Sequence, residues 1–140
     1  LASPTGLPAS GRNAYPVRAM WPISDEQLRE ALRHLPAVIY QDSHEPHPRT
    51  IYLSPNADTV LGSGADEHLR DPDLWWRSID PRDHDQLMAA WTHAYETEQP
   101  YTVDYRYLRP DGRVVWLREH ATPVRNEDGE ISHWFTRGLR

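Results

Sequence analysis

The pattern of apolar and polar positions predicts a helix, two strands, several short helices, one long helix and three strands, in that order. Near the C-terminus, strand-like segments cover about residues 101–109, 113–125 and 130–139, and Asp-Gly pairs at 111–112 and 128–129 separate them. An Asp-Gly pair between strand-like segments is the strongest short-range hairpin signal in a sequence. We therefore predict a three-stranded antiparallel meander.

The middle segment of this meander predicts a sheet that is apolar on both faces near its centre. Val115, Leu117 and Ala121 point to one face, whereas Val114 and Trp116 point to the other. We therefore expect other parts of the protein to pack against both faces of the sheet.

Two longer helices are predicted from their caps and their apolar stripes. The first covers residues 23–36: Ser24 and Gln27 form a capping box, and Pro36 ends the helix. The second begins at Asp80-Pro81, an N-cap followed by a first-turn proline, and ends near Glu98. The apolar stripes are Leu28, Ala31, Leu32 and Leu35 in the first helix and Leu87, Met88, Trp91, Ala94 and Tyr95 in the second.

The segment between the two helices predicts a strand pair and short helices. Residues 37–41 and 50–53 favour strands that pair as a hairpin around a polar loop. Ser54-Pro55 is expected to cap a helix of about two turns that Gly62 ends. One or two further helical pieces are expected within 64–79.

Composition narrows the classes of function. The 140 residues suit one domain, and residues 1–22, rich in Pro and Gly, are expected to form a flexible tail or linker. The formal charge is 15 − 21 = −6 without a basic cluster, which argues against a nucleic-acid partner. No Cys is present, so disulfides and cysteine-adduct flavin chemistry are excluded, and no apolar run is long enough to span a membrane.

The order of elements, together with six short motifs, resembles a PAS domain of the PAS-fold-3 type over about residues 24–140. The motifs are LPAVIY at 35–40, YLSP at 52–55, LG at 61–62, DPDLWWRSIDPRD at 71–83, DYRYLRPDGRVVWLRE at 104–119 and VRNEDGEISHWFTRG at 124–138. Two positions depart from the pattern. Asp80 stands where relatives often have His, and Ser63 stands where an aromatic residue often follows the Gly.

The resemblance implies an α+β fold, in which short helices and one long helix flank a five-stranded antiparallel sheet and enclose a small cavity. It implies a regulatory domain at 23–140 with an N-terminal flanking helix at 23–36. Relatives usually precede a histidine kinase, a cyclic-dinucleotide enzyme or a phosphatase, and an Asp-Ile-Thr-like motif follows their last strand. This chain stops at Arg140 before such a motif. We therefore expect a piece of a longer bacterial, cytoplasmic protein of two-component or cyclic-di-GMP signalling.

Large aromatic and apolar side chains are candidates for the lining of this cavity, because small-molecule sites are mostly apolar with a few polar groups. The expected pocket residues are Tyr40, Leu61, Leu87, Trp91, Tyr95, Tyr105, Leu117 and Trp134. The aromatic residues Trp75, Trp76, Trp116 and Phe135 are further candidates. All of them could equally fill a core. Any ligand is expected to be small and apolar.

Apolar stripes that need a partner predict a homodimer. The first helix could cover the outer face of its own sheet or pair with a second copy. The expected interface residues are Leu28, Leu32, Leu35, Val114 and Trp116.

Three other kinds of chemistry have candidate residues, and each has a simpler structural explanation. A haem reading rests on His93 in the long helix, but helical geometry turns His93 away from the apolar stripe. A metal reading rests on Asp42, His44, Glu45 and His47 in a polar loop. An acid–base reading rests on the pairs Asp83–Asp85 and Glu119–Asp128, which helix-end electrostatics and a turn explain.

The sequence thus favours a sensory and dimerisation domain that catalyses nothing itself, with no catalytic residue, no metal site and no required cofactor. One alternative is a haem- or small-ligand-binding gas or redox sensor. The other is a cone-shaped α+β protein that resembles nuclear transport factor 2 and its hydrolase or isomerase relatives. In those folds long helices come first, whereas a strand pair precedes the short helices and the long helix here.

Overall fold

The computed structural model describes residues 23–140. The chain divides into two compact units, one ending at Ala31 and the other spanning Leu32–Arg140. The predicted tail at 1–22 lies outside the described residues. Within the described part of the chain, no helix combines the length and the apolar character that a membrane crossing requires.

The larger unit is built on one antiparallel sheet of five strands in the order β4-β3-β7-β6-β5. β3 (Ala37–Ser43) and β4 (Thr50–Leu53) form the first hairpin, and β5 (Tyr101–Leu108), β6 (Val114–Arg125) and β7 (Ile131–Leu139) form the meander. β3 pairs with β7, so the N-terminal hairpin and the meander join into one sheet. The predicted α+β fold with a five-stranded antiparallel sheet is confirmed.

The two Asp-Gly pairs lie in the turns of the meander, as predicted. Gly112 has φ +88° and Gly129 has φ +81°, a left-handed conformation that glycine adopts without a steric penalty. In the second turn, the Oδ1 atom of Asn126 accepts hydrogen bonds from the main-chain N–H groups of Asp128 and Glu130.

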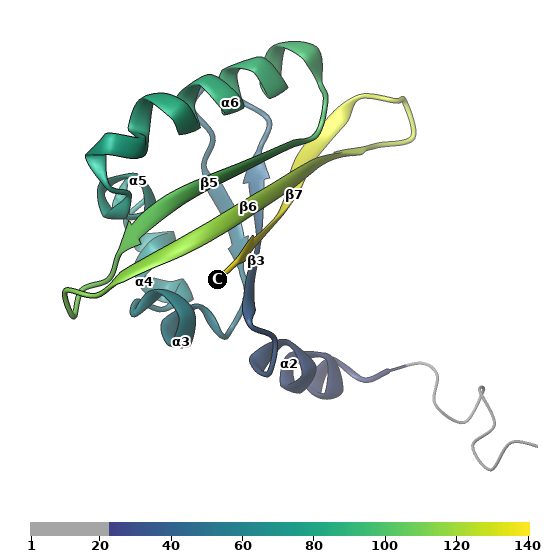
Figure 1. The fold of residues 1–140 in the computed structure, drawn as a ribbon. Helices are drawn as coiled ribbons and strands as arrows, with labels where there is room; N and C mark the ends of the chain where they lie inside the picture. Colours follow the sequence, from purple (N-terminus) through teal and green to yellow (C-terminus); the bar gives the residue numbers. More distant parts are fainter. Residues whose placement is uncertain (1–22) are drawn as a thin grey trace, which may run out of the picture. The chain divides into compact units, whose positions relative to one another are not determined.

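The helices of this unit run between β4 and β5 and lie against one face of the sheet (Figure 1). They are α3 (Ala57–Leu61), α4 (Ala65–Arg70), α5 (Leu74–Ser78), the 3-10 helix η1 (Pro81–Asp83) and α6 (His84–Thr97). α6 is the long helix that the sequence predicts, but it begins at His84, and the predicted start at Asp80-Pro81 begins the 3-10 helix η1 instead. The short pieces on either side of Pro72 are α4 and α5.

Helix α2 (Asp25–Arg33) carries the predicted capping box. The main-chain N–H of Gln27 donates to Ser24 Oγ at 3.1 Å, and the main-chain N–H of Ser24 donates to Gln27 Oε1 at 2.9 Å. These bonds satisfy main-chain donors that the first turn of a helix leaves free.

The predicted cap of α3 at Ser54-Pro55 is wrong. Asn56 occupies the N-cap position, and Ser54 Oγ instead accepts a hydrogen bond from the main-chain N–H of Ile39 at 2.9 Å. Asn56 Nδ2 donates to the carbonyl oxygens of Leu35 and Ala37 at 2.9 and 2.7 Å. The two polar side chains therefore serve the main chain next to and within β3, a long-range demand that local capping rules do not contain. Gly62 ends α3 in a left-handed conformation, as predicted.

Asp83 does more than stabilise the helix dipole. Asp80 is the predicted N-cap and accepts from the Arg82 main-chain N–H at 2.9 Å. Asp83, however, is buried and accepts from the Arg106 main-chain N–H, Nε and Nη2 at 2.8, 2.9 and 2.7 Å. These hydrogen bonds hold the pKa of Asp83 below its usual value and tie the start of α6 to β5. Asp85, the other member of the candidate acid pair, is exposed.

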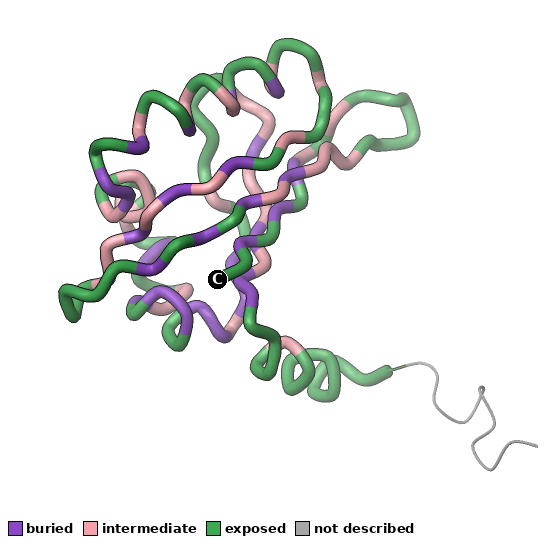
Figure 2. The backbone as a smooth tube through the Cα atoms, viewed as in Figure 1, coloured by how far each residue is buried: buried purple, intermediate pink, exposed green. Residues whose placement is uncertain are grey.

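Burial alternates along the strands (Figure 2), so the sheet has one core face and one outer face. The core face carries Tyr105, Tyr107, Leu117 and Trp134, each at most 1% exposed. On the outer face, Val114 and Trp116 are 52% and 57% exposed. The predicted division of β6 into two faces is confirmed.

Candidate functional site

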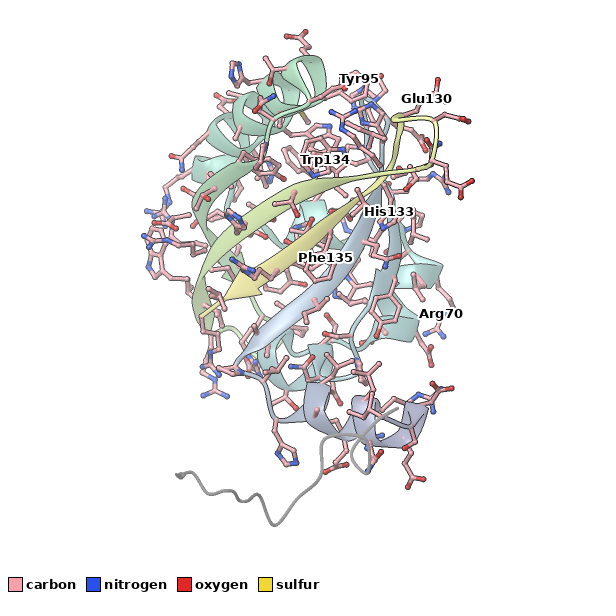
Figure 3. All side chains as sticks on the ribbon, turned by 90° about the vertical axis from the view of Figure 1, so that its right-hand side faces the viewer. Arg70, Tyr95, Glu130, His133, Trp134 and Phe135 are labelled. Carbon is pink, nitrogen blue, oxygen red and sulfur yellow. The ribbon has the colours of Figure 1, made fainter. Side chains whose placement is uncertain are left out.

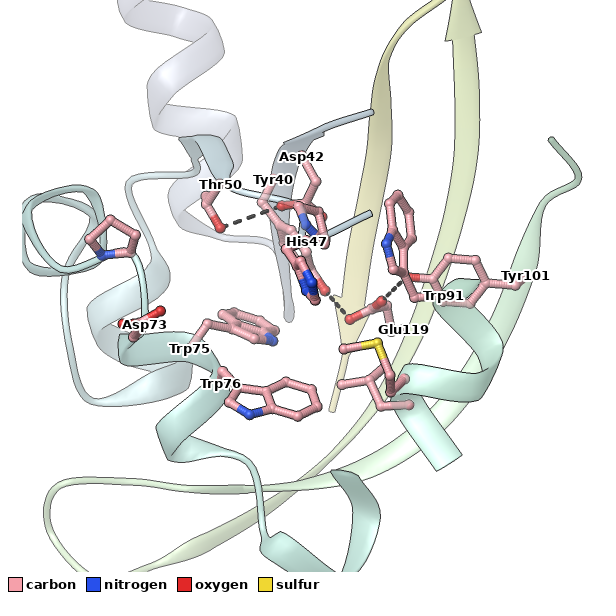
Figure 4. Close-up of a pocket in the computed structure, with 14 residues that line it drawn as sticks. Tyr40, Asp42, His47, Thr50, Asp73, Trp75, Trp76, Trp91, Tyr101 and Glu119 are labelled. Atoms are coloured by element: carbon pink, nitrogen blue, oxygen red, sulfur yellow. Dashed lines mark hydrogen bonds between the residues drawn. The ribbon is translucent and has the colours of Figure 1, made fainter. Parts of the chain in front are cut away.

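A cavity of about 370 Å³ opens on the core side of the sheet (Figure 4). Its walls come from β3, β4 and the loop between them, from α5 and the residues before it, from α6, and from β5 and β6. Fourteen residues line it: Tyr40, Asp42, His47, Pro48, Thr50, Pro72, Asp73, Trp75, Trp76, Leu87, Met88, Trp91, Tyr101 and Glu119.

The alternation of side chains along the strands determines which polar groups point into this cavity. Tyr40 and Asp42 are two residues apart on β3 and therefore share a face. Glu119 lies on β6 two residues from Leu117 and Ala121, so its side chain points to the core face with them. Figure 4 shows Glu119 beside Tyr101, with Trp91 on α6 nearby.

Glu119 is the most connected polar group of the cavity. It is 4% exposed, and its Oε1 atom accepts from Tyr40 OH at 2.5 Å and from Tyr105 OH at 2.7 Å. Its Oε2 atom accepts from Tyr101 OH. Three phenol donors therefore satisfy a buried carboxylate, which would otherwise cost several kcal/mol of stability.

The same cluster changes the acidity of the phenols. Burial, and then the charge of Glu119, raise the pKa of each of Tyr40, Tyr101 and Tyr105 well above the usual value. The three hydroxyls therefore stay protonated at neutral pH and serve as donors. They cannot act as phenolate bases.

Asp42 is the second carboxylate on the sheet side of the cavity, where Tyr40, Asp42 and Glu119 form what we call the inner wall. It is half-buried, and the hydroxyls of Thr50 and Thr136 donate to it over long distances of 3.4 Å each. Burial, and then the nearby charge of Glu119, raise the pKa of Asp42 well above its usual value. Asp42 therefore takes up a proton at a higher pH than an ordinary aspartate does.

This shift predicts how the variant Asp42→Asn changes stability with pH. Because the folded-state pKa is raised above the unfolded value near 3.8, the parent chain loses stability as the pH rises from there through the folded pKa. Asparagine has no charge to bury. We expect Asp42→Asn to raise the Tm at pH 7 by about 4 °C or more, equivalent to roughly 1 kcal/mol, and the gain to vanish near pH 4.

Thermal unfolding followed by circular dichroism between pH 4 and 8 measures this effect. Asp104→Asn is a control of opposite sign. The hydrogen bonds and charge of Arg118 hold the pKa of Asp104 below its usual value, so its removal loses stability at neutral pH. A lower Tm for Asp42→Asn at pH 7 would contradict the claim that burial and the charge of Glu119 disfavour the ionised form of Asp42.

Aromatic side chains form the rest of the wall and hold one another in place. The Trp75 ring lies 4.7 Å from that of Tyr40 and 5.3 Å from that of Tyr107, measured between centroids. The Trp76 ring stacks on His84 at 4.2 Å. Trp91 Nε1 donates to the carbonyl oxygens of Glu45 and Pro46, which fixes the β3–β4 loop at the edge of the cavity.

Three of the eight expected pocket residues line the cavity: Tyr40, Leu87 and Trp91. Leu61, Tyr105, Leu117 and Trp134 are at most 1% exposed and pack in the core, and Tyr95 is half-buried beside His44. Of the further aromatic candidates, Trp75 and Trp76 line the cavity. Trp116 and Phe135 do not, because both side chains lie on the outer face; Figure 3 labels Phe135 next to the buried Trp134.

The local sequence pattern does not indicate the polar residues of the cavity. It pairs Glu119 with Asp128 across a turn and offers Asp42 only as a metal ligand. It predicts neither the polar Thr50, Asp73 and Tyr101 nor the apolar Met88 as pocket residues. A signal for Glu119 did exist. A charged residue on the buried face of a strand, in phase with Leu117 and Ala121, is uncommon and favours a site.

The four candidate metal ligands do not form a metal site: Asp42 lies on β3 and not in the polar loop, where His44, Glu45 and His47 lie. Among the described residues, no group of three or more His, Cys, Asp or Glu side chains is placed to hold a metal ion. His44 Nδ1 accepts a hydrogen bond from Trp134 Nε1 at 3.1 Å, and Glu45 pairs with Arg49 at 3.1 Å. His93 of α6 is exposed, on the side predicted from the helical wheel.

The residues expected at a dimer interface lie at or near the surface. Leu28 and Leu35 are 49% and 42% exposed, and Leu32 is half-buried. On the outer face of the sheet, the Arg106 guanidinium lies 5.0 Å from the ring centroid of Trp116, a cation–π distance.

Comparison with known proteins places the chain in a family. A family model described as the PAS fold matches residues 50–136, which is more than half of the chain. The bacterioopsin transcriptional activator of Halobacterium salinarum is 25% identical over 113 residues. An uncharacterised protein of Sinorhizobium fredii is 30% identical over 61 residues. The matches cover 79% and 44% of this chain but 16% and 7% of those two proteins.

Solved structures show the same fold. The N-terminal domain of a diguanylate cyclase with a PAS/PAC sensor from Marinobacter aquaeolei is 22% identical with a TM-score of 0.62, over 74% of this chain and 93% of that chain. A PAS domain from Colwellia psychrerythraea is 17% identical with a TM-score of 0.63, over 81% and 92%. An RNA-binding light-oxygen-voltage receptor is 25% identical with a TM-score of 0.63, over 99% and 36%. The chain belongs to the PAS family of sensory domains.

Proposed function

We propose that this domain senses a small molecule that binds in the cavity on the core side of the sheet. The observation that carries the proposal is a cavity of about 370 Å³ with aromatic walls and a few oriented polar groups. Binding sites for small molecules have this volume and this composition. A ligand that binds one packing of the sheet and helices better than another shifts the balance between them.

The proposal includes an output outside these residues. The domain catalyses nothing itself and transmits its signal to a covalently linked domain in a longer, cytoplasmic protein. One relative in sequence is named as a transcriptional activator, and one in structure as part of a diguanylate cyclase. Transcriptional control and cyclic-di-GMP or two-component signalling are therefore the outputs we favour. We propose no nucleic-acid partner for the domain.

We also propose that two copies associate. The interface would include the apolar stripe Leu28, Leu32 and Leu35, and the outer-face residues Val114 and Trp116. Support comes from the exposure of these side chains, since more than half of the Trp116 surface contacts solvent. Burial of a large aromatic side chain between copies would stabilise a symmetric dimer.

Native mass spectrometry of the purified domain tests ligand and dimer together. We expect a dimer with a small molecule bound to each copy. The variant Met88→Trp narrows the cavity from α6 and is expected to lose the bound mass. The matched control is Ala89→Trp, the next residue on the same helix, whose side chain is exposed and which should retain the ligand.

Two outcomes would contradict the proposal. The sensory cavity would be contradicted if the purified domain carries no bound molecule and no compound in a metabolite library shifts its Tm. If the domain has the mass of a monomer at micromolar concentration, the dimer is contradicted and the cavity proposal still stands.

A further inference from the structure

The charges around the cavity are almost all negative. Among the fourteen lining residues are three carboxylates, Asp42, Asp73 and Glu119, and no arginine. His47 is the one lining side chain that can become positive, and it is exposed at the β3–β4 loop. The chain contains no lysine. Asp42 and Glu119 are held partly away from water, whereas Asp73 is exposed. Carboxylates in such a setting create a strong negative potential, because the local dielectric screens them weakly.

Two arginines that directly follow lining residues in the sequence are bound to other acids. Arg77 pairs with Asp71 at 2.7 Å, and Arg49 pairs with Glu45 at 3.1 Å. Neither guanidinium pairs with Asp42 or Glu119. Within residues 23–140, no salt bridge joins an arginine to either of these two acids.

The three phenols around Glu119 bring no positive charge either. Tyr40, Tyr101 and Tyr105 are neutral donors that bind the carboxyl oxygens of Glu119 by hydrogen bonds. Asp42 adds a second acidic group on the same wall. A ligand with a positive charge would relieve the repulsion between the two, whereas an anion would increase it.

Aromatic rings complete this environment. Tyr40, Trp75, Trp76, Trp91 and Tyr101 all line the cavity, and in the view of Figure 4 the indoles of α5 and the Trp91–Tyr101 pair lie on two sides of the carboxylate. The face of an aromatic ring attracts a cation, and groups of such rings recognise quaternary ammonium ions. Aromatic walls also bind the alkyl groups of such a ligand.

We propose that the ligand of this cavity is a small organic cation, an alkylated or quaternary ammonium compound, whose charge lies between the carboxylates and the aromatic rings. This inference rests on the proposed ligand-binding function and names the chemical class of the ligand. The cavity volume is sufficient for a compound of this class.

Three probes of matched shape test the charge preference. Choline carries a quaternary nitrogen, 3,3-dimethylbutan-1-ol has a carbon in that place, and 3,3-dimethylbutyrate is an anion of similar shape. Isothermal titration of each into the 140-residue chain at low salt measures the three affinities. We expect choline to bind at least about tenfold more tightly than the alcohol, and the anion to bind most weakly.

Two variants test whether the carboxylate and aromatic side chains of the cavity cause the preference for a cation. Glu119→Gln keeps the shape of the side chain and removes the charge, so it should weaken choline binding by about tenfold while the alcohol changes by less than about twofold. Trp76→Leu removes a half-buried ring and leaves all three carboxylates in place. It should also reduce the ratio of choline affinity to alcohol affinity. Glu127→Gln, an exposed acid in the β6–β7 turn, is the control that should change neither.

Equal or tighter binding of the alcohol, or no binding of choline at about 10 mM, would overturn the cation inference. So would an unchanged affinity ratio in both Glu119→Gln and Trp76→Leu. A neutral molecule bound to the purified domain and lost in Met88→Trp would overturn the inference and leave the sensory function standing. No bound molecule and no response to the probes or to the metabolite library would end both proposals.

Discussion

The variant Glu119→Ala is expected to lose about 3–5 kcal/mol of unfolding free energy, because it removes the common acceptor of two buried phenols and a half-buried one. A buried donor left without a partner costs about 1–3 kcal/mol. Tyr40 and Tyr105 are 2% and 0% exposed, so water reaches them poorly. Tyr101 is half-buried and can recover part of its loss by hydration.

Urea unfolding followed by circular dichroism measures this loss. The control Glu119→Gln keeps an oxygen for the two hydroxyls at Oε1, so we expect it to lose about 1–2 kcal/mol. An equal loss in both variants would mean that the charge, and not the acceptor, stabilises the cluster. A loss below about 1 kcal/mol in Glu119→Ala would show that the phenols find other partners.

The second large effect is expected for Trp134→Ala, with a loss of about 3–5 kcal/mol. Trp134 is 0% exposed on β7, and its ring contacts those of Trp91 at 5.2 Å and Tyr101 at 6.2 Å between centroids. Its Nε1 also donates to His44. Alanine would leave an unfilled volume at the point where α6 meets the sheet.

Trp116→Ala is the matched control, because it removes the same side chain from the same sheet on the opposite face. Trp116 is 57% exposed, and its ring contacts the guanidinium of Arg106. We expect a loss of about 1 kcal/mol or less. Denaturation at a protein concentration that keeps the chain monomeric separates this loss from any contribution of a dimer. Similar losses for the two variants would contradict the assignment of the core face.

Local signals in the sequence were enough to predict most elements of the fold. The Asp-Gly pairs located two turns, because few residue pairs adopt the dihedral angles that such turns require. Ser24 with Gln27, and Asp80 with Pro81, located two helix starts by hydrogen bonds that reach only two or three residues along the chain. The alternation along β6 gave its buried and exposed faces correctly, and the resemblance in element order gave the family.

Those signals failed where a side chain serves a distant part of the chain. Ser54 and Asn56 look like a helix start, but they bind the main chain at residues 35 to 39. Asp83 looks like a residue placed for the helix dipole, but it binds Arg106 on β5. In each case the partner lies some 15 or more residues away, beyond the reach of any capping or spacing rule.

The sequence by itself determined the order of the elements, their turns and the face that each residue of a strand presents. Only the tertiary structure decided which faces meet. Glu119 gathers Tyr40 from β3 and Tyr101 and Tyr105 from β5 because the strand order is β4-β3-β7-β6-β5 and α5 and α6 lie against the same face. The period of a strand fixes the direction of a side chain, but its neighbours depend on strand pairing, which is set by the packing of the whole core.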